Sequence, residues 1–225
     1  MNETALTAFH FSDQLKVVGF VALLGLIPYV LVLMTSFTRI SIILTFLRQA
    51  LGTSVPSTQI IVGLSLILTG YVMHPVITEV YEKAITPYFN KELKMEGKSE
   101  EIAFLEKGWP PLRHFMLTHT REKDLALFLE MGKVELSQTH PLLPEQIPWY
   151  CIVPSFVLSE LRIAFLMGFL LFLPFLVIDL VVTSLLMSMG MIMLPPVMIS
   201  FPFKLLLFVV VDGWRLIVQQ VVMGY

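Results

Sequence analysis

Long uncharged segments alternate with one charge-rich stretch along this sequence. Four segments contain no charged residue: 17–38, 49–78, 163–178 and 180–203. Because about 20 apolar residues in a helix cross a hydrocarbon layer of about 30 Å, runs of this length are candidate membrane spans. The pattern predicts four hydrophobic helical segments, near 17–38, 58–78, 161–186 and 197–222.

The charges gather between the second and third of these segments. Residues 79–145 carry 9 basic and 12 acidic side chains, which is 21 of the 15 + 17 = 32 charges in the chain. We therefore expect an all-α, membrane-associated protein in which two bent hydrophobic hairpins enclose a water-facing helical region. The expected parts are an N-terminal tail at 1–16, a first hairpin at 17–78, the hydrophilic region at 79–150 and a second hairpin with a methionine-rich tip at 151–225.

Two arginines indicate how the chain is oriented. Arg39 and Arg48 flank the link between the first two segments, and the positive-inside rule places this link in the cytoplasm. The N-terminus and residues 79–145 are then expected on the outer side. The first 16 residues lack the basic start of a signal peptide, so the first segment is expected to be retained.

Proline and glycine predict where the chain turns. Residues 51–57 and 190–196 are expected to form the tips of the two hairpins. In the hydrophilic region, Trp109-Pro110-Pro111 predicts a rigid turn, and Thr120 predicts the N-cap of a short amphipathic helix that stops at Gly132. Prolines inside the hydrophobic segments remove backbone hydrogen bonds, so bent helices sheltered by neighbouring chains are expected rather than straight lipid-facing rods.

Composition favours a membrane location over the alternative of four core helices in a soluble protein. Hydrophobic residues make up 56% of the chain and charged residues 14%, with a mean hydropathy of +0.80. Soluble domains have about 25% charged residues, so too little polar surface is left to cover four apolar helices. The net charge of −2 provides no basic face for nucleic acid.

Few residues suggest catalysis or metal binding. His114 and His119 are five positions apart, which differs from the i, i+4 spacing of a zinc-binding helix. The single cysteine, Cys151, excludes an intrachain disulfide and, beside an apolar run, is expected to be buried. The sequence contains no phosphate loop or nucleophile elbow. We therefore expect no enzyme, no cofactor and no metal; an intramembrane hydrolase would lack a nucleophile–base pair.

Charged residues stranded among apolar neighbours are more informative. They are Arg39, Glu160, Arg162, Asp179, Lys204 and Asp212. Each costs about 3 kcal/mol at membrane depth and so requires a partner or water. Asp179 lies 11 residues before Gly190 and Lys204 lies 9 after Pro195, so their heights along the hairpin differ by only about 3 Å. We expect the two to meet across the hairpin or across a subunit boundary, either as a packing ion pair or as the polar lining of a conduit.

The tip of the second hairpin is rich in methionine. Residues 187–193 contain four methionines. Methionine is flexible and polarizable, so a ring of such tips can close around varied shapes, and an apolar constriction excludes water and ions by dewetting. The alternative is a methionine-rich helix end packed in lipid or in a core.

Several motifs are similar to those of one family. They are MTSFTRI (34–40), LRQALGT (47–53), SELRIAF (159–165), LPFLVIDLVV (173–182), MSMGMIMLPPVMIS (187–200) and FPFKLLLFVVVDGW (201–214). These motifs resemble the FliP/SctR family of membrane proteins in the type III export apparatus. Thr38-Arg39 and HTREKDLALF (119–128) resemble the flagellar FliP branch.

The resemblance implies a gate-forming structural subunit that gives unfolded flagellar polypeptides passage across the bacterial inner membrane and templates the rod. It implies a helical oligomer, a pentamer joined by FliQ-like and FliR-like subunits, with FlhB-like and FlhA-like export proteins and the base of the flagellar rod as further partners. The hairpins of such an assembly lie largely on the periplasmic side of the membrane, in the flagellar basal body.

The resemblance also assigns residues. The pore constriction maps onto Met191, Ile192 and Met193, where isoleucine replaces the family's usual methionine and is stiffer. The turn that carries it contains Gly190, Pro195 and Pro196, which the glycine and proline pattern predicts. Embedded charges for assembly or lining map onto Glu160, Asp179 and Lys204, beside Arg39 in the flagellar motif.

A small-solute or ion transporter is the alternative function. It requires a polar site at mid-membrane, for which the sequence offers only a few charges and no inverted-repeat pattern of broken helices.

Overall fold

The computed structural model describes residues 25, 29, 32–54, 56–90, 100–134, 143–191 and 193–225. Over these residues all regular secondary structure is helical, which confirms the all-α prediction. The helices are α2 (Phe37–Leu51), α3 (Thr58–Val80), α4 (Thr86–Phe89), α5 (Glu100–His119), α6 (Glu122–Met131), α7 (Trp149–Ser188), α8 (Pro196–Val210) and α9 (Gly213–Met223). A π-helical turn at Tyr81–Ile85 joins α3 to α4, and a 3-10 turn at Pro144–Gln146 precedes α7. The predicted N-terminal tail at 1–16 and most of the first predicted hydrophobic segment, 17–38, lie outside the described residues.

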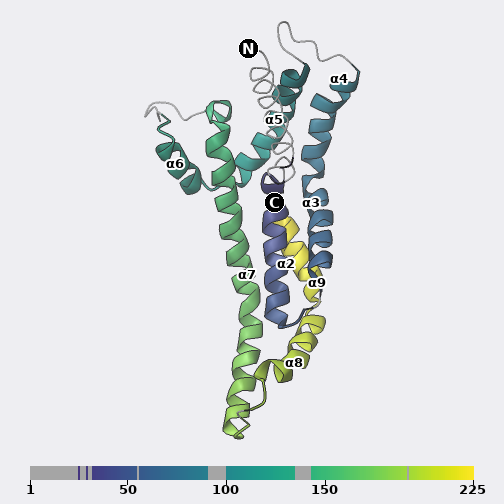
Figure 1. Ribbon diagram of the computed structural model, residues 1–225, viewed down its shortest axis with the longest axis vertical. Coiled ribbons are helices and arrows are strands. Elements are labelled where there is room, and N and C mark those ends of the chain that lie inside the picture. Colours follow the sequence, from purple (N-terminus) through teal and green to yellow (C-terminus); the bar gives the residue numbers. More distant parts are fainter. Residues whose placement is uncertain are drawn as a thin grey trace, which may run out of the picture.

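Helix α7 forms the long axis of the molecule. It extends over 40 residues, and Pro154 and Pro174 lie inside it without ending it. The helices of the first hairpin, α2 and α3, lie alongside α7 together with α9, and α8 returns from its lower end (Figure 1). The hydrophilic helices α5 and α6 lie beside its upper part (Figure 1).

Within the described part of the chain, two helical stretches are long and apolar enough to cross a membrane, Thr58–Phe89 and Trp149–Ser188. A third candidate consists of α8 and α9, which meet at an angle of 63°. The segment predicted near 197–222 is therefore two helices rather than one. The break occurs where Asp212 adopts a left-handed φ of +52°. Gly213 follows it because a Cβ there would lie 2.3 Å from the Phe208 ring.

Two apolar cores lie one above the other along α7. The lower core joins both hairpins and includes Leu44, Phe175 and Phe208. The upper core includes Met116 and Ile152 and holds the hydrophilic helices against α7. The lower core thus positions the second hairpin, whereas the upper core positions the middle region.

The stretch predicted to be a link between the first two segments is helical, and this prediction was wrong. Helix α2 contains both Arg39 and Arg48, and Arg39 is only 1% exposed. The positive-inside rule counts basic residues in loops that face the cytoplasm, so a buried helical arginine such as Arg39 gives no information on orientation. The tip predicted at 51–57 is present, because α2 ends at Leu51 and Gly52 takes a left-handed φ of +73°.

Two local predictions in the hydrophilic region were also wrong. Trp109-Pro110-Pro111 lies inside α5 instead of forming a turn. The packing of buried Phe115 and Met116 in the upper core outweighs the local cost of the two prolines. Thr120 does not cap α6: its hydroxyl donates to the Met116 carbonyl at 2.6 Å, and Arg121 occupies the N-cap position.

Candidate functional site: the methionine tip and two charge pairs

Helix α7 ends at a glycine turn that the local sequence specifies. The Gly190 N–H donates to the Met187 carbonyl at 3.1 Å, and the Met191 N–H donates to the Leu186 carbonyl at 3.0 Å. These two bonds form a Schellman motif, which requires a left-handed residue after the helix. Gly190 satisfies this with a φ of +73° at no steric cost.

Two prolines then return the chain into α8. Pro195 is extended, and Pro196 takes the first helical position, where its missing N–H would have no intrahelical partner. The turn predicted at 190–196 is therefore present, at the lower end of the molecule (Figure 1). We refer to residues 187–196 as the methionine tip.

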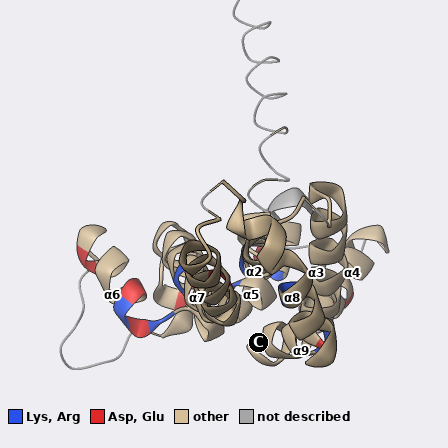
Figure 2. Ribbon diagram, turned by 90° about the horizontal axis from the view of Figure 1, so that it is seen from below, with Lys and Arg blue, Asp and Glu red and all other residues tan. Residues whose placement is uncertain are grey.

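The thioethers of the methionine tip are largely exposed. Met187 is 61%, Met189 67% and Met193 97% exposed, whereas Met191 is half-buried. Ile192 lies outside the described residues. Seen from below, the end of α7 that faces the viewer shows no charged ribbon, in contrast to α6 (Figure 2). The tip thus presents a flexible, charge-free apolar surface.

Asp179 and Lys204 pair across the α7–α8 hairpin, as their similar distances from the tip predict. Lys204 Nζ lies 2.7 Å from Asp179 Oδ2, and the Ser200 hydroxyl donates to Asp179 Oδ1 at 2.6 Å. The Lys204 side chain is 3% exposed and that of Asp179 is 30% exposed. Both carboxylate oxygens have a donor, so the pair fixes the register of the two helices behind the tip.

The same ammonium group ties the first hairpin to the second. Lys204 Nζ also donates to the Ala50 carbonyl at 2.9 Å, at the end of α2 where the helix dipole is negative. A Cβ at Gly52 would lie 3.0 Å from the Val197 side chain, so glycine here lets α8 approach. The sequence did not predict this contact, because a backbone carbonyl leaves no signal in the residue types.

A second charge pair, which is fully buried, joins α2 to α7. Arg39 Nε donates to Glu160 Oε2 at 2.8 Å, and a terminal guanidinium nitrogen bonds Oε1, which makes the contact bidentate. The two side chains are 2% and 0% exposed. Both residues were singled out as stranded charges, but their pairing was not predicted. Their opposite signs are a weak signal, because Arg162 and Asp212 are also left once Asp179 and Lys204 are matched.

Tyr225 completes this second pair and was not predicted from the sequence. Its hydroxyl donates to Glu160, and the guanidinium carbon of Arg39 lies 3.8 Å from the centre of its ring. Burial, reinforced by the Glu160 charge, raises the pKa of the Tyr225 phenol far above its ordinary range, so the group stays a donor. The Tyr225 carbonyl lies 3.1 Å from Nε2 of His119. This residue therefore connects α2, α5 and α7.

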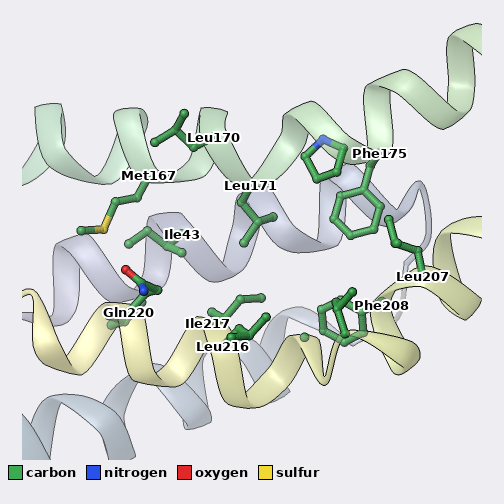
Figure 3. Close-up of a pocket in the computed structure, with 14 residues that line it drawn as sticks. Ile43, Met167, Leu170, Leu171, Phe175, Leu207, Phe208, Leu216, Ile217 and Gln220 are labelled. Atoms are coloured by element: carbon green, nitrogen blue, oxygen red, sulfur yellow. The ribbon is translucent and has the colours of Figure 1, made fainter.

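An apolar cavity of about 430 Å³ separates α7 from α9. Leu171 and Phe175 of α7 face Ile217 of α9 across it, with Ile43 of α2 behind (Figure 3). Gln220 is the sole polar side chain in its lining. The cavity contains no nucleophile or acid–base pair, and no group of three His, Cys, Asp or Glu suited to a metal occurs in the described ranges.

Comparison with known proteins identifies the family. The model of the FliP family matches residues 20–221, which is most of the chain. The chain belongs to the FliP family. It is 44% identical to the flagellar biosynthetic protein FliP of Bacillus subtilis (strain 168) over 220 residues, which covers 96% of this chain and 94% of that protein.

Two further FliP proteins show the same breadth of similarity. The flagellar biosynthetic protein FliP of Pectobacterium carotovorum subsp. carotovorum is 47% identical over 203 residues, covering 90% of this chain and 75% of that protein. That of Aquifex aeolicus (strain VF5) is 42% identical over 214 residues, covering 95% and 86%. FliP proteins are structural components of the flagellar export apparatus and not enzymes. With its candidate spans, the chain is a membrane-located flagellar component.

Proposed function

We propose that this FliP-family chain forms the gate of the flagellar type III export apparatus, through which unfolded flagellar polypeptides cross the bacterial inner membrane. The methionine tips of several copies meet at a common axis and close the channel. One observation carries this proposal: an exposed, charge-free thioether surface lies at the end of a hairpin whose two helices are locked by a buried charge.

The closed state depends on the apolar character of the tip. A ring formed by Met191, Ile192 and Met193 from several copies holds back water and ions, because a narrow apolar constriction dewets. Flexible thioethers let the ring adapt to an exported polypeptide and then close again. Gly190, Pro195 and Pro196 set the turn that presents these side chains. The energy for transport comes from other components of the apparatus.

The buried charges serve the packing of the subunit rather than the lining of the channel. Arg39 and Glu160 are almost completely enclosed by their own chain and by Tyr225. Lys204 is enclosed as well and bonds the end of α2. Charges held in this way fix the two hairpins against each other before the subunit joins its neighbours.

The proposed assembly is a helical pentamer completed by FliQ-like and FliR-like subunits and contacted by FlhB-like and FlhA-like export proteins. Residues 79–150 face the periplasm, and the upper end of the assembly templates the flagellar rod. The 63° bend between α8 and α9 and the charges embedded in α7 support a position largely outside the lipid, since neither suits a straight lipid-facing helix.

Ion conductance through the reconstituted export complex tests the gate. Replacing Met191 and Met193 together by alanine removes thioether bulk from the ring and is expected to raise ion leakage while assembly survives. The matched control replaces Met131 and Met223, which are 69% and 73% exposed but lie on α6 and α9. Equal conductance of the two double variants in assembled complexes would contradict the proposed gate.

A further inference from the structure

Most of the strongly exposed methionines among the described residues lie at or beside the tip. Met187, Met189, Met193 and Met198 at or beside the tip are 61%, 67%, 97% and 72% exposed. Met34, Met73 and Met116 in the upper core are 9%, 2% and 0% exposed. Met131 on α6 and Met223 on α9 are also exposed, at 69% and 73%, but only the tip gathers several exposed thioethers of the described residues in one short segment.

We propose that the methionine tip is an oxidation site whose chemical state sets the tightness of the gate. This inference rests on the proposed function. Susceptibility to oxidation follows exposure, so small oxidants such as hydrogen peroxide reach the tip thioethers before the buried ones. Among the exposed thioethers, those of the tip are the ones that the proposed function places at the channel.

The chemistry is a simple oxygen transfer. A lone pair on the methionine sulfur attacks one peroxide oxygen, the O–O bond breaks, and an S–O bond forms. The products are methionine sulfoxide and water: sulfur loses two electrons and peroxide gains them. A thiol-dependent sulfoxide reductase reverses the step by returning two electrons and releasing the oxygen as water.

The backbone of the tip tolerates this change. The turn is held by backbone bonds from Gly190 and Met191, and the hairpin behind it is held by Asp179 and Lys204. None of these contacts uses a thioether. Oxidation therefore makes the surface of the tip polar without unfolding the turn, and it does so once for every copy around the axis.

A polar ring cannot keep the channel dry. Dewetting requires an apolar lining, and sulfoxide is a strong hydrogen-bond acceptor. Oxidation of the tips is therefore expected to hydrate the closed constriction and to admit ions, whereas reduction restores the seal.

Brief peroxide treatment of the purified, reconstituted complex tests the inference in two readouts. Peptide mass spectrometry is expected to find sulfoxide at Met187, Met189 and Met193 well before Met73 and Met116. Ion conductance is expected to rise with the oxidation of the tip and to fall after treatment with sulfoxide reductase and a thiol.

Three double variants test whether oxidation of the tip thioethers causes the change in conductance. Met191→Leu with Met193→Leu keeps the tip apolar but removes two thioethers, and it is expected to blunt the response to peroxide. Met191→Gln with Met193→Gln imitates the sulfoxide and is expected to leak without peroxide. Met131→Leu with Met223→Leu removes exposed thioethers elsewhere and is expected to leave the response unchanged.

Two results would overturn the inference. One is oxidation of the tip at the same rate as the buried methionines. The other is unchanged conductance after full oxidation of the tip, when the alanine variants of Met191 and Met193 do leak. In that case the proposed gate would stand and the oxidation switch would fail. If the alanine variants are also tight, the gate itself fails.

Discussion

The guanidinium group of Arg39 stacks on the ring of Tyr225, 3.8 Å from its centre, while both side chains bond Glu160. Three residues from the beginning, middle and end of the described chain therefore share one buried site. Arg39 also donates to the Gly224 carbonyl at 2.7 Å, which fixes the end of α9 against α2. The closure of the two hairpins depends on this site as well as on the apolar cores.

Replacing Tyr225 by phenylalanine tests the hydroxyl alone. The ring remains on Arg39, but Glu160 loses one of its donors, and a lost bond to a buried charge costs about 1.5–3 kcal/mol. We expect a lower thermal midpoint of the detergent-extracted chain, and a larger drop for Tyr225→Ala, which also removes the ring. Tyr29→Phe, at an exposed position (70%), is the control. Identical midpoints for Tyr225→Phe and the parent would contradict the assigned bond.

Removing Asp179 is expected to destabilise the subunit more than removing Lys204. Asp179→Ala leaves a buried ammonium group with only the Ala50 carbonyl, which is expected to cost about 3–5 kcal/mol. Lys204→Met leaves a carboxylate that is partly exposed, can hydrate and keeps the Ser200 hydroxyl. We therefore expect lower yields of assembled complex for Asp179→Ala than for Lys204→Met, measured by native electrophoresis. The double variant should recover part of the loss; the reverse order of the single variants would refute this account of the pair.

Gly168 marks the close approach of α2 and α7. A Cβ at this position would lie 2.5 Å from the Phe46 ring, so Gly168→Ala must push the helices apart. We expect a destabilised chain, although alanine favours helices by about 1 kcal/mol over glycine. Gly70→Ala in α3, where nothing lies within 4 Å, is the matched control and should be neutral or stabilising. Equal thermal midpoints for the two variants would rule out the tight contact.

Gly190 tests the backbone of the methionine tip separately from its side chains. A Cβ there meets no atom within 4 Å, so the cost of Gly190→Ala arises from the left-handed φ alone, at about 1–2 kcal/mol. We expect normal assembly with a misplaced tip and increased ion leakage. Gly190→Asn, which tolerates this conformation better, should leak less than Gly190→Ala. Equal ion leakage from the two variants would contradict the claim that the left-handed turn at Gly190 positions the tip.

Whether a contact could be predicted from the sequence depends on how far apart its two residues lie along the chain. The Asp179–Lys204 pair could be predicted because both residues are close in sequence to one turn, so helix rise alone sets their heights. The Arg39–Glu160 pair spans 121 positions and depends on how α2 packs on α7, which no local rule provides. The burial of Cys151 was predicted correctly from its apolar neighbours.

The wrong predictions share one physical cause. Arg39 interrupts an apolar run, so it was taken as the end of a span, yet a bidentate carboxylate makes it a core residue. Pro110 and Pro111 have a strong local preference against helix, but the upper core stabilises α5 through Phe115 and Met116. In each case tertiary packing outweighed the local preference.

Cross-linking between copies tests the central claim most directly. The native Cys151 is 1% exposed, so a cysteine introduced at Met193 provides the reactive thiol. Treatment of membranes that contain the assembled apparatus with a short bismaleimide is expected to join Met193→Cys chains into covalent dimers, because each chain offers one reactive thiol. The exposed Met131→Cys position on α6 should not be joined. Met193→Cys chains that remain monomeric in an assembled, exporting complex would contradict the meeting of the tips at a shared axis.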